Sequence, residues 1–184
     1  PLEGVTREMR SNAKTVNFGI IYGVSAFGLS QQSSLSRKEA GEIIKNYFKT
    51  YPKLKEYMDA NIAFAREHGY VKTIMNRKRR LKDINSRNAV VRGHAERNAI
   101  NAPVQGSAAD VIKLAMIKIQ REIDLLGLQS KMLLQVHDEL VFDVLKTELP
   151  TLKKLIKETM EGVLDSNIPL IVDLDVGESW LEAH

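Results

Sequence analysis

The chain has 184 residues, of which 43% are hydrophobic, and its 27 basic and 23 acidic residues give a formal net charge of +4. This composition excludes a disordered chain, is typical of a globular protein with one sizeable core or two small lobes, and slightly favours polyanions as partners. The absence of cysteine excludes disulfide and thiolate–metal chemistry and fits a reducing, cytoplasmic location, and no apolar run or leader indicates a membrane or secretion.

Two helical segments are predicted at the start of the chain. Over residues 6–22, apolar residues recur at helical spacing, and Gly23 directly after them is a typical helix stop. The next helix should begin at Ser36, because Ser36 and Glu39 have the spacing of a capping box. We expect this helix to break at Pro52, since proline interrupts the hydrogen bonds of a helix interior.

A small β segment should interrupt the helices. After a helix end at Gly69, residues 70–74 are predicted to form a short strand and residues 76–80 a basic turn. A further helix over residues 87–100 should be cut at Pro103. The first half is thus expected to be helical with a small strand insert.

The second half combines helices and strands. A deeply buried helix is predicted from Ser107 as N-cap to Gly127, because its residues are apolar on nearly every side. Residues 131–144 consist of two apolar runs around a polar tip, the pattern of a β-hairpin. A helix capped by Thr147 and a half-buried strand over residues 170–176 follow. This order predicts a three-stranded antiparallel sheet with helices on one face.

The tip of the predicted hairpin carries His137, Asp138 and Glu139. Mg²⁺ prefers oxygen ligands and keeps most of its water, so one or two rigidly held carboxylates plus phosphate oxygens make a normal site for it. The alternative is a solvated turn in which the two acids merely avoid burial. The segment alone does not decide between a metal site and a plain turn.

One face of the first predicted helix combines two cations with two aromatic rings. Four-residue spacing places these side chains in a row, in the order Arg10, Lys14, Phe18 and Tyr22. A ligand lying there would meet positive charge first and ring surface next, which suits a triphosphate joined to a base. The alternative is a solvated basic face whose aromatic residues are covered by other elements.

Two further groups of polar residues could bind a nucleic acid. Basic residues cluster at the predicted turn, where they either grip a phosphate backbone or only add solubility: Arg77, Lys78, Arg79, Arg80 and Lys82. Around the break at Pro103, Arg97, Asn101 and Gln105 could read acceptors in a DNA minor groove. Capping and loop bracing are the alternative for this second group.

Taken together, three of these segments resemble signature motifs of family A DNA polymerases, the bacterial DNA polymerase I type. They are residues 10–23, 97–110 and 135–139, and they occur in the order of the family. The resemblance covers essentially the whole chain and implies an α+β fold, in which a mostly helical fingers lobe precedes a partial palm with a small antiparallel sheet packed against helices. A change in composition supports a boundary between residues 1–90, the fingers, and residues 91–184, the C-terminal part of the palm.

The resemblance implies template-directed DNA synthesis, in which a nucleotide passes from a dNTP to the 3′-hydroxyl of a primer on primer–template DNA. By resemblance, Arg10 and Lys14 contact the triphosphate, and Lys14 takes part in catalysis. Phe18 would pack on the sugar and base, and Tyr22 would lie by the templating base. Phenylalanine rather than tyrosine at position 18 is the version associated in the family with discrimination against dideoxynucleotides.

The resemblance also assigns roles to the hairpin. Asp138 would ligate catalytic Mg²⁺ with Glu139 as an auxiliary carboxylate, and His137 would lie near the primer strand. Such metal ions activate the primer hydroxyl and neutralise the leaving pyrophosphate. By resemblance, Arg97 and Gln105 would touch the minor groove of the primer–template. Asn101 and the basic residues Arg77, Arg79 and Arg80 are expected to contact DNA on the strength of their residue types alone.

One family motif is missing, the strand of the type Asp-Tyr-Ser-x-x-Glu-Leu-Arg that supplies the other catalytic aspartate. It would lie before Pro1, where the sequence reads like the middle of a protein, so we expect a fragment that lacks half of its metal site and is inactive alone. The fragment would expose a sheet edge beside residues 131–144, and self-association through this edge is expected. The alternatives are a fragment of a single-subunit RNA polymerase and a non-catalytic nucleic-acid-binding module.

Overall fold

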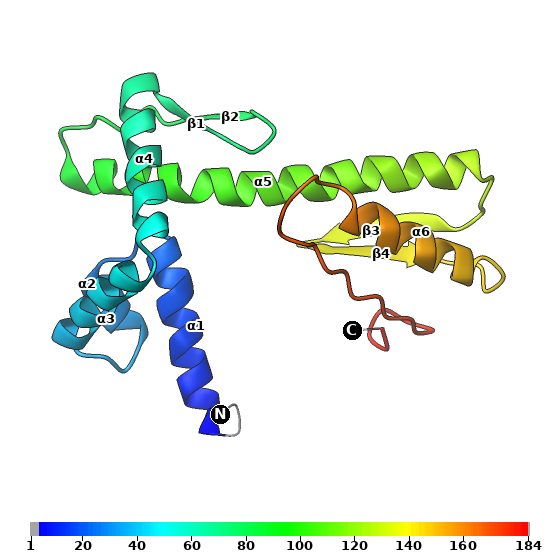
Figure 1. The fold of residues 1–184 in the computed structure, drawn as a ribbon, viewed down its shortest axis with the longest axis horizontal. Helices are drawn as coiled ribbons and strands as arrows, with labels where there is room; N and C mark the ends of the chain where they lie inside the picture. Colours follow the sequence, from blue (N-terminus) through cyan, green and yellow to red (C-terminus); the bar gives the residue numbers. More distant parts are fainter. Residues whose placement is uncertain (1–3, 184) are drawn as a thin grey trace. The chain divides into compact units, whose positions relative to one another are not determined.

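The structure is a computed structural model that describes residues 4–183, so the chain start at Pro1, which suggested a fragment, lies outside the described residues. The described residues form six α-helices and two antiparallel sheets of two strands each (Figure 1). The predicted α+β class is therefore confirmed. None of these helices combines the length and the apolar character needed to cross a membrane.

The chain divides into two compact units, Pro1–Gly106 and Ser107–His184. Helix α5 (Ala89–Leu125) contributes residues to both units. The expected division into residues 1–90 and 91–184 concerns the subdomains of the family and stays a prediction. Each unit is described by itself below.

The first unit is helical apart from one hairpin. Before α5 it contains α1 (Arg7–Ile21), α2 (Ala26–Gln32), α3 (Arg37–Thr50), α4 (Pro52–His68), β1 (Tyr70–Lys72) and β2 (Lys78–Arg80). The N-terminus of α3 has the predicted capping box, because the Ser36 hydroxyl accepts from the backbone N–H of Glu39 and the Glu39 carboxylate accepts from that of Ser36. Pro52 lies in the first turn of α4, where a missing N–H does little harm.

Helix α1 has the predicted start and stop. The hydroxyl of Thr6 accepts a hydrogen bond of 3.1 Å from the backbone nitrogen of Met9 and so caps the helix. Gly23 follows the helix with a φ of +74°, a left-handed conformation that glycine adopts without strain. The predicted bounds of this helix, residues 6–22, are therefore confirmed.

The β1–β2 hairpin differs from the prediction. The structure forms a second strand, β2, where a basic turn was expected, and pairs Val71 with Arg79. The strand was missed because its side chains are all basic and show no alternation of apolar and polar residues. Val71 is buried in the core of this unit, which consists of Ala65, Val71, Leu81, Ile84, Ala95, Ala99 and Ala102.

Helix α5 corrects the prediction of two helices around Pro103. It is continuous over its whole length, with Pro103 inside it and Ser107 within the helix rather than at an N-cap. An interior proline costs a helix about 3 kcal/mol, because it removes a hydrogen bond and its ring crowds the preceding turn. Burial of Ala99 and Ala102 against the core of the first unit helps to offset this cost.

The C-terminal half of α5 is less buried than its apolar sequence suggested. Ile119 is fully buried, whereas Ile117 is 62% exposed, so one side packs and the other reaches the surface. The predicted stop is confirmed, since Gly127 has a φ of +63° and the backbone nitrogen of Leu128 donates to the carbonyl of Ile123.

The second unit contains the predicted hairpin, β3 (Lys131–Val136) and β4 (Glu139–Asp143), and helix α6 (Leu149–Glu161). Its core is formed by Ile119, Ile123, Leu152 and Ile156, with side chains of the hairpin packed against them. Thr147 does not cap α6, because the helix begins at Leu149 and Glu148 occupies the cap position. Pro150 lies in the first turn as expected.

The strand predicted over residues 170–176 does not form. Its side chains do alternate, with Val172 and Leu174 half-buried and Asp173 and Asp175 exposed. Within the described residues, no strand lies beside this segment to pair with its backbone, and the backbone nitrogen of Val172 donates instead to the carboxylate of Glu161. The sheet of this unit therefore has two strands, not three.

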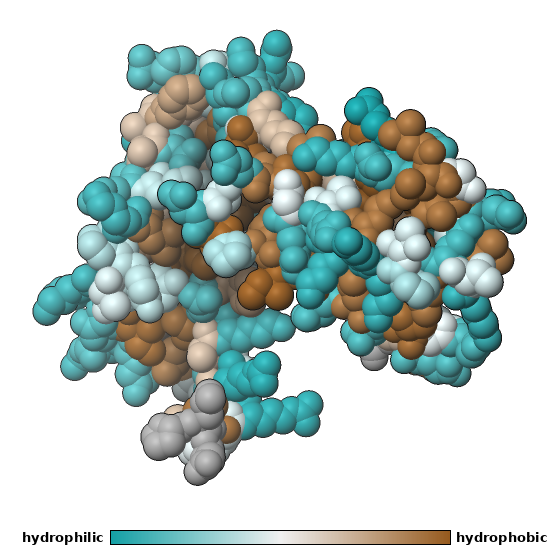
Figure 2. Space-filling view, turned by 45° about the vertical axis from the view of Figure 1, so that its right-hand side comes forward, coloured by the Kyte–Doolittle hydropathy of each residue, from teal (hydrophilic) through white to brown (hydrophobic). Residues whose placement is uncertain are grey.

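Large hydrophobic side chains reach the surface of the second unit and contribute to the brown patches in the right-hand part of Figure 2. On β3, Leu133 is 55% and Leu134 is 51% exposed. Contiguous exposed apolar patches are features by which interaction surfaces are recognised. The expected self-association through the sheet edge nevertheless stays a prediction.

Candidate functional site

The structure places the four side chains of the α1 motif along one exposed face of the helix. The Phe18 and Tyr22 rings are stacked, with centroids 6.2 Å apart and planes 21° apart. The Lys14 ammonium nitrogen lies 6.0 Å from the centroid of Phe18, and Arg10 is exposed one turn before it. Phe18 is 45% and Tyr22 is 39% exposed, so other elements do not cover these aromatic residues. Within this unit, the face can offer charge and ring surface to one ligand.

Helix α1 packs mainly through its C-terminal end. Ile20 is 1% exposed, whereas Met9 near the other end is 57% exposed. A Cβ added to Gly23 would lie 3.3 Å from the side chain of Arg97, and one added to Gly19 would lie 3.0 Å from that of Val24. These glycines allow the close approach that holds the C-terminal end, while the N-terminal turns have few packing partners.

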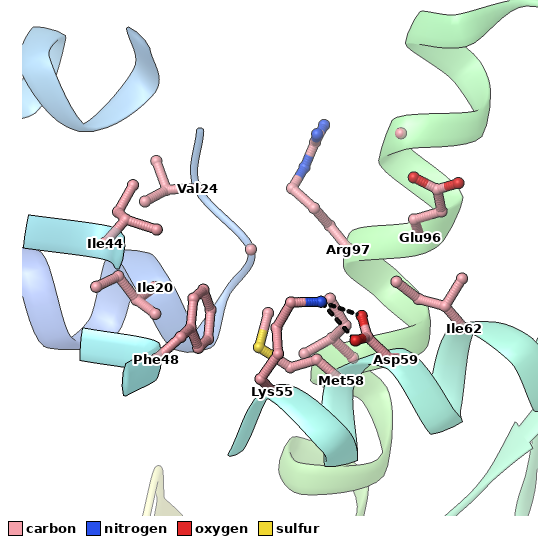
Figure 3. A pocket seen from close by; sticks show the side chains of 13 residues that line it. Ile20, Val24, Ile44, Phe48, Lys55, Met58, Asp59, Ile62, Glu96 and Arg97 are labelled. Atoms are coloured by element: carbon pink, nitrogen blue, oxygen red, sulfur yellow. Dashed lines mark hydrogen bonds and ion pairs between the residues drawn. The ribbon is translucent and has the colours of Figure 1, made fainter. Parts of the chain in front are cut away.

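A cavity of about 290 Å³ lies next to this end of α1 (Figure 3). Helices α3 and α4 contribute an apolar wall that includes Phe48 and Met58, and α4 also contributes the ion pair of Lys55 with Asp59. Arg97 of α5 extends along the cavity with its guanidinium directed away from that ion pair (Figure 3). No sequence motif indicated this cavity, because its lining comes from four separate helices.

The basic hairpin and α5 contact each other within the first unit. The Arg79 guanidinium donates to Oδ1 of Asn98 at 3.4 Å, and that of Arg77 donates to the carbonyl of Gly106 at 3.1 Å. Arg80 is exposed. Of the three arginines of this hairpin that are expected to contact DNA, Arg77 and Arg79 therefore also brace the hairpin against the helix.

The polar residues around Pro103 lie on a helix and not on a loop. Four-residue spacing along α5 places Arg97, Asn101 and Gln105 in one row, with Arg97 and Gln105 exposed. Oδ1 of Asn101 is buried and has no hydrogen-bond partner among the described residues. The irregular backbone expected at Pro103 is thus absent, and groove reading by this group stays a prediction.

The tip of the β3–β4 hairpin presents the predicted carboxylates. His137 has a φ of +54°, an uncommon conformation for a residue other than glycine, and its carbonyl accepts a hydrogen bond of 2.6 Å from the Gln135 side chain. Asp138 is exposed and Glu139 is half-buried. Two oxygen-donor side chains suit a hard cation such as Mg²⁺. Over residues 4–183, however, no group of three or more metal-ligating side chains gathers in one place, and the metal site expected at this tip stays a prediction.

A hydrogen-bonded cluster that the sequence did not reveal holds the open end of this hairpin. The Glu148 carboxylate accepts from the backbone of Gln129 and from both the backbone and the hydroxyl of Ser130, the latter at 2.6 Å. The Ser130 hydroxyl in turn accepts from the backbone nitrogen of Leu145. The Gln129 bond, followed by that of the Ser130 hydroxyl, lowers the pKa of Glu148 below its ordinary value. The cluster ties the start of β3, the end of β4 and the start of α6 together.

Comparison with known proteins identifies the family. The model of DNA polymerase family A matches residues 1–182. The chain belongs to DNA polymerase family A. The resemblance inferred from three motifs is thereby confirmed, and the α+β fold with a helical fingers region and a partial palm is that of the family.

Relatives of this family A chain include two bacterial enzymes. DNA polymerase I of Streptococcus pneumoniae strain R6 is 52% identical over 181 residues, which are 98% of this chain and 21% of that protein. DNA polymerase I of Caldicellulosiruptor bescii is 51% identical over 178 residues, 97% of this chain and 21% of that protein. The chain thus spans about a fifth of the length of these relatives.

A solved structure has the same fold. The polymerase domain of Pol1 from M. smegmatis, in complex with DNA primer-template and dNTP, matches with a TM-score of 0.95 and 42% identity. The match covers 100% of this chain and 32% of the M. smegmatis chain.

Proposed function

We propose that this chain is the fingers and the C-terminal part of the palm of a DNA polymerase, which transfers nucleotides from dNTPs to the 3′-hydroxyl of a primer on a DNA template. The observation that carries the proposal is the exposed α1 face, where Lys14 precedes the stacked Phe18 and Tyr22 rings. Family membership and the solved relative in complex with primer-template and dNTP support it. Residues 1–90 are assigned to the fingers and residues 91–184 to the palm.

In this proposal the α1 face binds the incoming dNTP. Arg10 and Lys14 contact the triphosphate, and Lys14 stabilises the charge that develops on the leaving pyrophosphate. Phe18 packs on the sugar and base, and Tyr22 lies by the templating base. Weak packing of the N-terminal turns of α1 supports a helix that moves when it closes on the nucleotide.

The hairpin tip is proposed to hold catalytic Mg²⁺, with Asp138 as ligand and Glu139 as auxiliary carboxylate. When bound, the metal lowers the pKa of the primer hydroxyl and screens the charge on the phosphates. Asp138 is exposed and therefore open to a hydrated cation that brings phosphate oxygens as further ligands. His137, held at the turn by its backbone conformation, is proposed to lie near the primer strand.

Primer–template DNA is proposed to bind to α5 and to the basic hairpin of the first unit. Arg97, Asn101 and Gln105 are proposed to face the minor groove, and the exposed side chains of Arg97 and Gln105 can donate to acceptors on the base edges there. The phosphate backbone lies against the basic hairpin residues Arg77, Arg79 and Arg80. A cytoplasmic location belongs to the same proposal, because DNA and dNTPs are found there in bacteria.

Primer extension by the complete polymerase tests the proposal with Asp138→Asn. This isosteric change removes a charged metal ligand, and we expect at least a ~100-fold loss of kcat, the cost of losing one well-placed electrostatic contact. Asp173→Asn, which neutralises an exposed acid remote from the hairpin tip in sequence, is the matched control. Extension by Asp138→Asn at the control rate would refute the proposal.

We further propose that a protein of these 184 residues alone does not extend a primer and associates with itself through the edge of the β3–β4 sheet. The sequence lacks the Asp-Tyr-Ser strand that would face Asp138, and Leu133 and Leu134 are exposed. Light scattering over a range of concentrations tests the association. A clean monomer at high concentration contradicts it.

A further inference from the structure

The outer face of the β1–β2 hairpin gathers one aromatic and three basic side chains. The register pairs Tyr70 with Arg80 and Lys72 with Lys78, and side chains of directly paired residues lie on the same face. The other face carries Val71, which is buried in the core. Lys72, Lys78 and Arg80 are all exposed, so this outer face is open to a ligand.

The pairing of Lys72 with Lys78 is electrostatically unfavourable. Like charges directly opposite each other in an antiparallel pair destabilise it, whereas an opposite pair would stabilise it. Over residues 4–183, no carboxylate lies within ion-pair distance of Lys72, Lys78 or Arg80. The acids closest in sequence are Glu67, which lies 3.9 Å from the His68 ring nitrogen, and the exposed Asp83. An anionic ligand would remove the repulsion that the chain itself leaves uncompensated.

Aromatic rings adjoin these cations. The Lys78 ammonium lies 4.5 Å from the centroid of the Tyr70 ring, and the His68 ring stacks on Phe64 with centroids 4.1 Å apart. Tyr70 meets both rings edge-on. His68 remains exposed, so part of this ring surface can be reached from solvent. Cations that follow a backbone next to rings that accept bases are the features by which proteins bind single-stranded nucleic acid.

We propose that the outer face of the β1–β2 hairpin binds single-stranded DNA, with phosphates at Lys72 and Lys78 and a base against the rings of His68 and Tyr70. Bases of a duplex are stacked on one another and cannot reach these rings, so the rings favour an unpaired strand. The inference rests on the proposed function only in choosing DNA as the nucleic acid. The bound single strand could have two sources with the same chemistry. One is the unpaired template ahead of the primer, and the other is a strand that is displaced from the template during synthesis.

Lys72→Glu tests the inference without harming the hairpin. The substitution turns the like-charge pair into an opposite-charge pair, so the thermal unfolding midpoint should not fall. Binding of a fluorescent oligo-dT of about 12 nucleotides, a length within the range of known single-strand sites, is measured by anisotropy without metal or dNTP. We expect the dissociation constant to rise about fivefold or more and the salt dependence to weaken, because a phosphate contact is lost. Lys38→Glu, with the same charge change on the exposed first turn of α3, is the control.

Three outcomes would overturn the inference: equal effects of Lys72→Glu and Lys38→Glu, an equal effect on a blunt duplex, or unchanged oligo-dT binding by His68→Ala. A duplex with a template overhang and a nicked duplex with a 5′ flap distinguish the two sources. If Lys72→Glu weakens binding of the overhang substrate, the face binds the unpaired template, and if it weakens binding of the flap substrate, the face binds the displaced strand. Failure here is separable from failure of the proposed polymerase function, because Asp138→Asn should leave oligo-dT binding unchanged while it lowers the kcat of primer extension at least ~100-fold.

Discussion

The ammonium group of Lys14 lies 6.0 Å from the centre of the Phe18 ring, one helical turn further along the exposed face of α1. This spacing fixes the order in which a ligand meets charge and ring surface. The distance is at the outer limit of a cation–π contact, so the ring does not strongly hold the cation. The ammonium group therefore stays available to a phosphate.

Lys14→Ala should weaken both the binding and the use of dNTPs in the complete polymerase. We expect a loss of about 100-fold or more in kcat/KM for dNTP, because the contact acts on charge that develops at the leaving phosphates. Steady-state primer extension measures both parameters. Lys45→Ala, an exposed lysine on α3, should leave them unchanged. An effect on KM alone would contradict a role in the chemical step.

Phe18→Tyr should raise the incorporation of dideoxynucleotides. The exposed ring of Phe18 offers no polar group, whereas a tyrosine hydroxyl there could supply a hydrogen bond that a dideoxynucleotide lacks. Competition between a dNTP and its dideoxy analogue gives the selectivity directly. Tyr22→Phe removes a hydroxyl one turn away and should not change that selectivity in the same direction. Unchanged selectivity in Phe18→Tyr would count against the position assigned to this ring.

Local signals in the sequence were enough to predict much of the fold and part of the site. The capping box of Ser36 and Glu39 and the stop at Gly23 depend on neighbouring residues and are present in the structure. The α1 face could be predicted for the same reason, because helical spacing alone brings Lys14 next to Phe18.

Features that depend on distant residues could not be predicted in this way. The helix continues through Pro103 because tertiary packing outweighs a local penalty, and residues 170–176 lack a neighbouring strand although their pattern alternates. The bond from Arg79 to Asn98 and the Ser130–Glu148 cluster likewise join residues well separated in sequence. No periodicity reports such contacts.

The Ser130–Glu148 cluster should make the stability of the chain depend on pH. The hydrogen bonds lower the pKa of Glu148 in the folded chain, so the folded state favours the charged carboxylate. This stabilisation is fully present above the ordinary glutamate pKa and is lost as the pH falls through the lowered folded value. Glu148→Gln should therefore be less stable than the wild type near neutral pH, and this difference should shrink in acid.

Thermal unfolding of the wild type and Glu148→Gln at several pH values measures this difference. Glu178→Gln is a control, because Glu178 is an exposed acid that forms an ion pair with the exposed Lys146. A stability difference between wild type and Glu148→Gln that is equally large at every pH would show that geometry, not charge, maintains the cluster.

Gly106→Ala should destabilise the first unit although alanine is the better helix former. A Cβ at this position would lie 2.6 Å from Cγ2 of Thr73, so the β1–β2 loop must shift. Overpacking costs about 1–3 kcal/mol, whereas replacing a helical glycine with alanine contributes about 1 kcal/mol. We therefore expect the steric term to dominate and the unfolding midpoint to fall.

The double variant Gly106→Ala/Thr73→Ser separates these two terms. Serine lacks the Cγ2 methyl group that clashes, but it keeps the hydroxyl that accepts a hydrogen bond from the backbone nitrogen of Arg77. With the clash removed, the helix propensity of alanine remains, so the double variant should be at least as stable as Thr73→Ser alone. If Gly106→Ala is equally destabilising in both backgrounds, the cost does not come from contact with Thr73, and the loop does not pack on α5 as closely as the structure indicates.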